Sequence, residues 1–544
     1  MKPRLLPAAA LIALATLSCG SARADGESQA PIAARLSALA EQPRPVIEGD
    51  GLIAHIALSR LYAAPAHLYW QDAVRRAALF AAIRNSAGDG LTPSDYHLAA
   101  LERLEARPGA DSAVEFDLLA TDAYVLLLYH LYLGKVDPLS IEPHWGLTLR
   151  TLNEQRALEF VHAALEDGTI AESVARVRPN HWLYAHGVAT LARYRALAAA
   201  GGWPTLPAGG KLAPGGNDAR VPTLRRRLAI SGDYDGKDLD SIELDAAVTE
   251  ALRVFQRRHL LAADGALGAA TLRELNVPVA ARIQQLRINL ERGRWVLHEI
   301  GPGDLVIVDI AGYGVRLLHD DKTLWRTRAI VGEPFRQTPV FRAEIERVVL
   351  NPTWTVPPGI LEKDVLPGMQ HGRNVLERNH LKVYRHDGGE VDLHSIDWSR
   401  WTARTFPYVL RQDAGDGNAL GRVKIDFPNP YFVYLHDTPS RALFERDDRT
   451  FSHGCIRVEH PLELAERLLA DPEHWNAAAI NAAVEAGTTR YVNLAHKVPV
   501  LVMYWTADED EDGRTVFKRD LYRRDARLGR ALDGKFSVGS RARP

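Results

Sequence analysis

The chain has 544 residues, of which 46% are hydrophobic and 25% charged, and 66 Lys and Arg side chains nearly balance 68 Asp and Glu. This length exceeds what one hydrophobic core usually supports, so it predicts several domains. The near-neutral charge argues against a nucleic-acid partner, which usually requires a basic surface.

The first 24 residues have the pattern of an export signal. Lys2 and Arg4 form a basic start, and the apolar run from Leu5 to Leu17 is too short to span a bilayer comfortably. Ala22-Arg23-Ala24 offers a small-residue cleavage site. We expect an exported protein cleaved near Ala24. Lipid attachment at Cys19 is the second interpretation and an uncleaved membrane anchor the third.

The cysteine content points to a reactive thiol. The chain has two cysteines, and removal of Cys19 with the signal leaves Cys455 without an internal disulfide partner. The neighbours of Cys455 are Ser, His, Gly and Arg, a poor match to the apolar surroundings of an inert, buried cysteine. We therefore interpret Cys455 as a working side chain.

The region 25–205 is predicted to be a helical scaffold domain. Apolar residues recur at helical spacing in three stretches, Ile53 to Tyr62, Ala73 to Ile83 and Asp117 to Leu133. In the third stretch we expect Thr121 as the N-cap and Gly134 as the stop. The apolar run 124–133 is too short for a membrane span and favours a buried core helix.

The Gly- and Pro-rich segment 206–219 predicts a linker, and 220–279 predicts a small helical unit. Helices are expected over Pro222 to Ala229, Asp245 to Arg258 and Ala269 to Leu275, with a turn at Asp264-Gly265. The unit resembles the three-helix peptidoglycan-binding domain through Val254-Phe255-Gln256-Arg257 and the run from Asp264 to Leu272. The alternative is a generic helical hairpin. A connecting helix over Ala280 to Val296 follows, within 280–302.

Beyond residue 303 the apolar residues alternate with a period of two, which is typical of strands. The expected strands are Leu305 to Ile310, Val315 to Leu318, Trp325 to Val331, Ala343 to Leu350, Phe432 to His436 and Val498 to Trp505. Short strands joined by turns favour a mostly antiparallel sheet or sandwich. The fold class is therefore multidomain α+β, with a β domain over 303–506 and a tail over 507–544.

A long insertion interrupts this β domain. It spans about 65–80 residues, which is long for a loop without internal structure. We expect a helix over Ile360 to Leu366 and a cap over about 357–420. Such an insertion beside a reactive side chain is commonly a lid or a substrate-binding subdomain, and surface decoration is the alternative.

The segment 436–457 contains the groups needed for acyl transfer. His436 ends a predicted strand, which would mount a general base rigidly, and Cys455 is the candidate nucleophile. Gly454 allows a tight turn, so that the N–H groups of Gly454 and Cys455 face a developing oxyanion. The expected supporting residues are Ser452, His453, Gly454 and Arg457.

The same segment raises a metal alternative, with ligands His436, His453, Cys455 and His460. Zinc ligands that are close in sequence usually leave at least two residues between them, whereas His453 and Cys455 leave one. The sequence has no CxxC or HxxxH motif that would supply a further pair of metal ligands. We expect neither a metal nor an organic cofactor.

These residues resemble the active-site signature of the L,D-transpeptidase family. The signature comprises His436, a spacer of fifteen residues and Ser-His-Gly-Cys-Ile-Arg at 452–457. Further matches are Asn351-Pro352-Thr353-Trp354, Asn418-Ala419-Leu420-Gly421, Phe427-Pro428-Asn429 and His436-Asp437-Thr438-Pro439. Arg457 stands where many small members have Asn. The chain is thus more similar to the large periplasmic members, which have a scaffold domain and an inserted cap.

The resemblance implies a role for each matching residue. Cys455 is the nucleophile and His436 the general base, oriented by a nearby backbone carbonyl for which Asp437 is one candidate. His453 and Arg457 shape the site and anchor or polarise the donor. Contacts to the substrate or the cap are expected from Trp354, Asn418 and Tyr434.

The resemblance also implies a reaction. The donor is a peptidoglycan tetrapeptide stem whose third residue acylates Cys455 with release of D-Ala. The amine of diaminopimelate on a second stem then resolves the thioester into a 3→3 cross-link. Family members are also acylated by carbapenems. Two alternatives remain, an L,D-carboxypeptidase that uses water and a non-catalytic cell-wall-binding scaffold.

Overall fold

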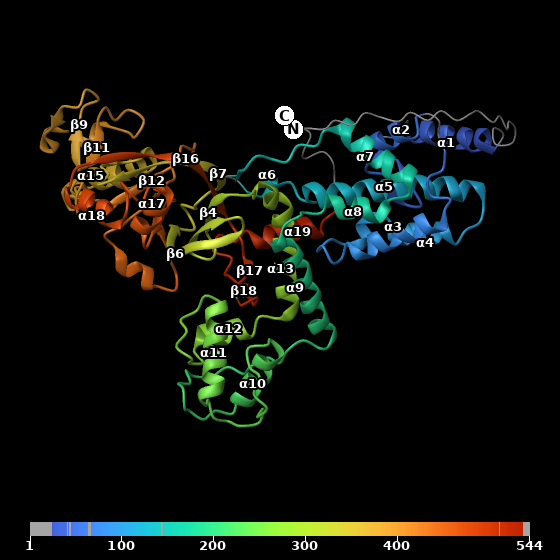
Figure 1. Ribbon diagram of the computed structural model, residues 1–544, viewed down its shortest axis with the longest axis horizontal. Coiled ribbons are helices and arrows are strands. Elements are labelled where there is room, and N and C mark those ends of the chain that lie inside the picture. Colours follow the sequence, from blue (N-terminus) through green and yellow to red (C-terminus); the bar gives the residue numbers. More distant parts are fainter. Residues whose placement is uncertain are drawn as a thin grey trace, which may run out of the picture. The chain divides into compact units, whose positions relative to one another are not determined.

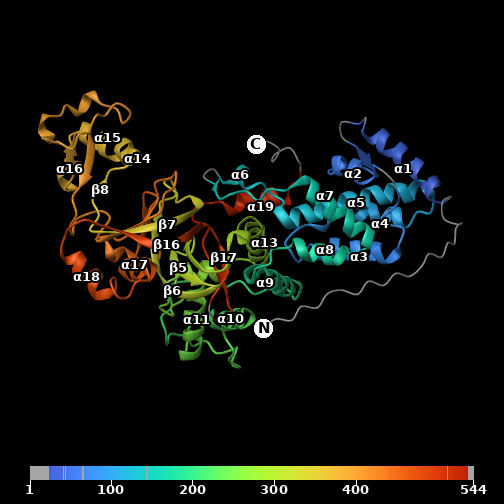
Figure 2. The same ribbon diagram turned by 45° about the horizontal axis from the view of Figure 1, so that its top comes forward.

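The structure is a computed structural model that describes residues 24–40, 42, 45–63, 67–142, 145–510 and 512–536 (Figures 1 and 2). The chain forms two compact units. The first comprises residues 1–87, 92–130 and 152–177, and the second comprises residues 88–91, 131–151 and 178–544. The expected export signal before Ala24, including Cys19, lies outside the described residues.

The first unit is helical, as the sequence predicts. Its helices are α1 (Ala24–Ala40), α2 (His55–Leu61), α3 (Ala73–Asn85), α4 (Leu98–Glu105), α5 (Ala110–Leu133), α7 (Glu154–Asp167) and α8 (Ile170–Val177). Among the described residues, α5 is long and apolar enough to cross a membrane by length and composition. Yet 83% of its most apolar stretch is buried within the protein. It is therefore a core helix.

The start of α5 differs from the prediction. The helix begins at Ala110, so Thr121 is not its N-cap but a buried residue inside it. The Thr121 hydroxyl accepts a hydrogen bond from Trp70 Nε1 at 2.9 Å. The first turns of α5 contain polar residues, which interrupt the apolar pattern used to predict the helix. One of them is Asp111, whose negative charge is favourable at a helix N-terminus. The end is as predicted, because Gly134 adopts a φ of +89° directly after Leu133.

The second unit contains a small three-helix domain. It consists of α10 (Val221–Ile230), α11 (Ala246–Arg258) and α12 (Ala269–Leu275). Its core is formed by Leu206, Val221, Leu224, Leu228, Tyr234, Leu244, Val248, Ala251, Leu252, Phe255, Leu267 and Leu275. The predicted linker 206–219 contributes to this domain, since Leu206 is buried in the core and Leu212 bridges to Leu267. Helices α9 (Trp182–Ala199) and α13 (Val279–Val296) pack against each other in the same unit.

The rest of the second unit is built around a ten-stranded sheet. Its strands are β3 (Trp145–Gly146), β4 (Asp304–Asp309), β5 (Gly314–His319), β6 (Lys322–Gly332), β7 (Val340–Leu350), β12 (Val423–Asp426), β13 (Leu435–His436), β14 (Thr450–Ser452), β15 (Ile456–Val458) and β16 (Arg490–Met503). The order is β12-β13-β15-β6-β5-β4-β16-β7-β3, and β14 pairs with β6. A further pairing of β12 with β7 closes the path on itself. Closure leaves few unpaired edges.

The α+β class is confirmed, and the sheet is mixed, with six antiparallel and four parallel strand pairings. Strand β13 runs parallel to β15, and β4 runs parallel to β16. Parallel neighbours require long crossover connections, which the short-strand pattern of the sequence does not reveal. Helices α17 (Pro461–Leu469) and α18 (Ala477–Glu485) lie in the connection from β15 to β16. Pro461 occupies the first position of α17, where the missing N–H of proline costs no hydrogen bond.

The insertion is a folded subdomain. A four-stranded sheet of order β10-β9-β11-β8 comprises β8 (Trp354–Thr355), β9 (Lys382–Tyr384), β10 (Glu390–Val391) and β11 (Val409–Gln412). It is accompanied by α14 (Pro358–Ile360), a π-helical turn over Leu361–Val365, α15 (Leu366–Gln370) and α16 (Val375–Arg378), drawn in gold in Figure 2. Its separate core is Val356, Val365, Leu376, Leu381, Val383, Ile396 and Leu410. A separate core explains how an insertion of this length stays ordered.

The predicted tail is also folded. Strands β17 (Ala507–Glu509) and β18 (Thr515–Phe517) form a hairpin, and α19 (Asp525–Asp533) packs against α13. Strand β18 and the residues after it therefore pack as part of the fold, although the sequence predicts only a tail here. Residues 537–544 lie outside the described part of the chain.

Candidate active site

Parallel pairing of β13 and β15 brings the predicted base and nucleophile together. His436 is the register partner of Arg457, and Leu435 is that of Ile456. Cys455 is the residue just before β15, so it lies beside the β13 strand end. The predicted strand over 432–436 is reduced to Leu435–His436, because Phe432 has a φ of +55° that ends the extended conformation.

A cavity of about 800 Å³ lies in front of these strand ends, between the cap and the sheet. Eight of the nine predicted site residues line it, namely Trp354, Tyr434, His436, Ser452, His453, Gly454, Cys455 and Arg457. Asn418 is instead buried in the loop before β12. Its side chain accepts from the Leu420 N–H and donates to the Asp413 carbonyl, so it shapes that loop.

His436 is held in one tautomer. Its Nδ1 lies 2.5 Å from the carbonyl oxygen of Asp437. A carbonyl can only accept, so Nδ1 carries the proton and Nε2 is left as the basic nitrogen. Burial, with the nearby charges of Arg457 and Lys424, lowers the pKa of His436 to about 3. The imidazole is therefore neutral, with Nε2 unprotonated.

Cys455 is a protonated thiol at rest. Burial raises its pKa, which outweighs the lowering by hydrogen bonds from Tyr434 and by the charges of Lys424 and Arg457. The Sγ atom is 3.6 Å from the Phe432 carbonyl oxygen, to which a thiol can donate. Together with the depressed pKa of His436, this favours a neutral thiol–imidazole pair over a preformed thiolate–imidazolium pair.

The turn that carries Cys455 is fixed by hydrogen bonds. Gly454 has a φ of +114°, which a side chain would strain. Its N–H donates to Ser452 Oγ at 3.1 Å, and Ser452 Oγ donates to the Cys455 carbonyl at 2.5 Å. The Gly454 N–H is thus already engaged, contrary to the predicted pair of oxyanion donors. The Cys455 N–H is the remaining candidate of that pair.

The sequence analysis did not predict three charged residues of the cavity wall, Arg336, Lys363 and Asp364. Asp364, in the π-helical turn of the cap, forms an ion pair with Arg336 at 2.7 Å, and its Oδ2 lies 3.3 Å from His453 Nε2. Among the residues that line the cavity, Asp364 supplies the sole carboxylate, whereas Arg336, Lys363 and Arg457 are basic. Lys424, next to Tyr434 at 4.5 Å, adds to the positive field. None of these residues belongs to a local motif, so composition alone gave no signal.

Metal binding gains no support from this arrangement. Within the ranges that the structure describes, no group of three or more His, Cys, Asp or Glu side chains is placed to hold a metal ion. His460 pairs with neighbouring carboxylates of Glu459 and Glu463 rather than lining the cavity.

Comparison with known proteins agrees with the site. Family models match an L,D-transpeptidase catalytic domain over residues 303–500, a scaffold domain over 56–191 and a "Putative peptidoglycan binding domain" over 217–275. Residues 303–500 thus match the catalytic domain of the L,D-transpeptidase family. The three matches follow one another along the chain in the order scaffold, peptidoglycan-binding and catalytic domain.

A curated relative from Haemophilus influenzae, named "Putative L,D-transpeptidase", is 35% identical over 248 residues. The match covers 46% of this chain, and the chain spans about half, 49%, of that relative's length. Two solved structures are also similar, each at 13% identity and a TM-score of 0.18. An L,D-transpeptidase from Xylanimonas cellulosilytica covers 55% of this chain and 99% of its own, and one from Mycobacterium smegmatis covers 37% and 59%. Scores this low support no structural argument.

Proposed function

We propose that this protein is an L,D-transpeptidase that forms 3→3 cross-links in peptidoglycan through a thioester on Cys455. The observation that carries the proposal is the pairing in one cavity of a thiol with a neutral imidazole whose tautomer is fixed by the Asp437 carbonyl. That arrangement leaves Nε2 free to take the thiol proton as the sulfur attacks.

The proposed first half-reaction acylates the enzyme. The Cys455 proton passes to His436 Nε2 while Sγ bonds to the carbonyl carbon of the third residue of a tetrapeptide stem. The tetrahedral oxyanion is stabilised by the Cys455 N–H and the positive field of Arg457. The C–N bond to the terminal D-Ala then breaks, and the proton on Nε2 moves to the departing amine.

The proposed second half-reaction releases the acyl group. The amine of a second stem's diaminopimelate loses a proton to His436 and attacks the thioester carbonyl, and the C–S bond breaks. The returned proton restores the Cys455 thiol. Water in place of the amine gives a tripeptide, which is the L,D-carboxypeptidase alternative. The basic cavity wall suits stem peptides, which carry several carboxylates.

Purified disaccharide tetrapeptide tests this proposal. We expect mass spectrometry to detect a dimer that lacks one D-Ala, and no turnover by Cys455→Ala or His436→Ala. Tripeptide without dimer would replace the transpeptidase by the carboxypeptidase. Full activity of Cys455→Ala would exclude the cysteine mechanism. A carbapenem should add its mass to Cys455 in the intact protein.

We propose that the cap holds the stem peptide against Cys455. The cap can be deleted without separating the strands that flank it, because Thr355 and Arg411 are register partners on adjacent antiparallel strands. Their Cα atoms are therefore about 5 Å apart, a gap that a two-residue Asn-Gly turn closes. Replacing residues 356–410 by Asn-Gly removes the cap core and leaves the ten-stranded sheet intact.

The excised variant should retain a folded catalytic sheet and an alkylatable Cys455, with a raised KM for the tetrapeptide. Iodoacetamide labelling of Cys455, measured by peptide mass mapping, controls for an intact site. Unchanged KM and kcat would remove the cap from substrate binding and leave it a surface decoration.

We propose that the enzyme acts in the periplasm, with an export signal over 1–24 and a scaffold domain over 25–205. We also propose a wall-binding domain over 220–279 and a catalytic domain over 303–506. The family matches and the exported pattern of the first residues support this organisation. Fractionation of cells that express the full chain tests it, and recovery of the protein in the cytoplasm would contradict it.

A further inference from the structure

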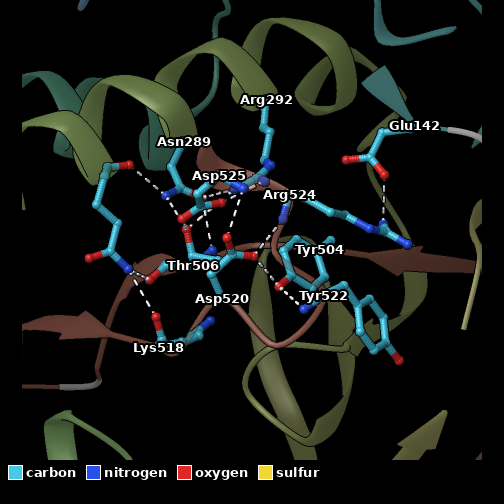
Figure 3. Close-up of polar contacts among 11 residues, drawn as sticks. Glu142, Asn289, Arg292, Tyr504, Thr506, Lys518, Asp520, Tyr522, Arg524 and Asp525 are labelled. Atoms are coloured by element: carbon cyan, nitrogen blue, oxygen red, sulfur yellow. Dashed lines mark hydrogen bonds and ion pairs between the residues drawn. The ribbon is translucent and has the colours of Figure 1, made fainter. Parts of the chain in front are cut away.

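A polar network supports the turn at residues 452–455 that carries Cys455, here called the catalytic turn. Several of its residues lie beyond the part of the chain that matches the catalytic family. That match ends at residue 500, whereas the network includes Tyr504, Tyr522 and Arg524 (Figure 3). The rings of Tyr504 and Tyr522 stack with centroids 5.4 Å apart, and the Tyr522 N–H donates to the Tyr504 hydroxyl. Arg524 lies over the Tyr522 ring at 5.0 Å and pairs with Glu142 at 2.8 Å. Tyr522 therefore has a fixed position.

The Tyr522 hydroxyl clamps the loop between β6 and β7. It donates to the Gly332 carbonyl at 2.8 Å and accepts from the Thr338 N–H at 3.2 Å. Arg524 adds a hydrogen bond from its guanidinium to Gln337 Oε1 at 2.7 Å. Tyr522 and Thr338 are 6% and 0% exposed, so water cannot substitute for the hydroxyl.

Thr338 continues the contact to the catalytic turn. Its hydroxyl accepts from the Gly332 N–H and donates to the Gly454 carbonyl, both at 2.9 Å. The Gly454 carbonyl and the Cys455 N–H belong to one planar trans peptide and point in opposite directions. Fixing the carbonyl oxygen therefore fixes the direction of the Cys455 N–H. That N–H is the oxyanion donor left once Ser452 engages the Gly454 N–H.

We propose that Tyr522 and Thr338 are positioning residues, which orient the Cys455 N–H toward the oxyanion of the acylation step. The C-terminal segment is thus part of the catalytic apparatus, although it lies outside the catalytic family match. Neither residue lines the cavity. They act through the Gly454–Cys455 peptide. Replacing them should lower kcat, because the oxyanion exists only in the transition state and the intermediate.

Two reactions of Cys455 separate this role from simple support of the fold. Acylation by p-nitrophenyl acetate passes through a tetrahedral oxyanion and releases a burst of p-nitrophenol. Alkylation by iodoacetamide displaces iodide at carbon and forms no oxyanion. A misoriented N–H slows the first reaction alone, whereas a collapsed site slows both. Neither reagent depends on the proposed peptidoglycan substrate.

Tyr522→Phe in the full-length exported protein is the first test. The ring and its stacking remain, and the burst rate should fall about tenfold, a fraction of the 10²–10³ lost when an oxyanion donor is removed outright. Alkylation should stay within about twofold. Tyr234→Phe is the matched control, because this buried hydroxyl also donates to a carbonyl, that of Asp238, and accepts from Arg225 in the three-helix domain.

Thr338 supplies the second test. Thr338→Val keeps the shape but removes the hydroxyl, and should lower the burst rate about 10- to 100-fold. Thr338→Ser restores the hydroxyl and should recover most of the rate, which a packing role of the lost methyl would not predict. With the tetrapeptide, both slow variants should lower kcat and leave KM nearly unchanged.

Equal burst rates for Tyr522→Phe and Tyr234→Phe would overturn the inference. Parallel losses of alkylation and acylation would also overturn it, as would a wild-type protein that is alkylated but never acylated. The inference rests on the proposed nucleophile but not on the proposed acceptor. A normal burst without cross-linked product would refute the cross-linking function and leave the positioning role standing.

Discussion

Gly421→Ala should weaken the support of His436 without touching the cavity. Gly421 has a φ of +60°, and a Cβ added there would lie 2.5 Å from Cγ and Oδ2 of Asp437 and 2.7 Å from its Cβ. Contact with Cβ means that rotating the carboxylate away does not relieve the clash, so the Asp437 backbone must move. The carbonyl of that residue holds His436 Nδ1.

The expected loss of stability combines two costs and one gain. Placing a Cβ in the left-handed region costs about 1–2 kcal/mol. Overpacking against a buried side chain adds about 1–3 kcal/mol. Asp437 is 2% exposed, accepts from the Arg422 N–H and pairs with Arg441, so its displacement also disturbs buried hydrogen bonds. Reduced freedom of the unfolded chain returns about 0.4–1 kcal/mol. The catalytic domain should lose about 2–4 kcal/mol of unfolding free energy.

Chemical denaturation monitored by tryptophan fluorescence measures this loss, and the p-nitrophenyl acetate burst measures the accompanying fall in acylation. Gly417→Ala is the matched control. It lies in the same loop, has no left-handed φ, and its added Cβ meets His380 Cδ2 at an ordinary 3.5 Å. Stability of Gly421→Ala equal to that of Gly417→Ala would refute the steric reasoning. A destabilised variant with a normal burst would refute the coupling from Asp437 to His436.

Three further predictions concern the protonation of Cys455, the charge of Asp364 in the cavity wall and the core of the three-helix domain. Because burial raises the pKa of Cys455 and lowers that of His436 to about 3, iodoacetamide alkylation should accelerate continuously above pH 8. A plateau between pH 5 and 8 would instead reveal a preformed thiolate. Asp364→Asn removes the sole carboxylate among the residues that line the cavity, so the wall becomes more positive and the KM of the carboxylate-bearing tetrapeptide should fall about two- to fivefold in steady-state kinetics. Leu252→Ala, fully buried in the three-helix domain, should cost about 2–5 kcal/mol and reduce co-sedimentation with purified sacculi while Cys455 alkylation is unchanged.

Local patterns in the sequence predict most of the regular elements. The helix α12 has the predicted bounds, and Asp245 is the N-cap of α11 through its bond to the Val248 N–H. Both successes rest on short-range signals, the apolar period and capping chemistry. The start of α5 and the short β13 were missed because a polar first turn and the left-handed Phe432 override the periodicity.

The residues of the site likewise include some that a local motif predicts and others that only the fold brings together. His436 and Cys455 belong to one short signature and were found from sequence, and the orienting carbonyl of Asp437 was named among the candidates. Thr338 is 116 residues from Gly454 and 184 residues from Tyr522 along the chain. Contacts across such separations depend on the pairing of β6 with β15 and on the folded C-terminal segment. A single sequence contains no local signal for either.

The neutral state of the thiol and imidazole explains why these distant supports matter. A preformed thiolate would begin with a strong nucleophile, whereas here the proton must leave sulfur as the new bond forms. The oxyanion that appears at that moment needs a donor already in place. Acylation and release of the thioester pass through oxyanions at the same carbonyl carbon, so one fixed N–H serves both half-reactions. Variants of Thr338 should therefore slow both steps by similar factors, whereas the identity of the acceptor depends on the cavity wall and the cap.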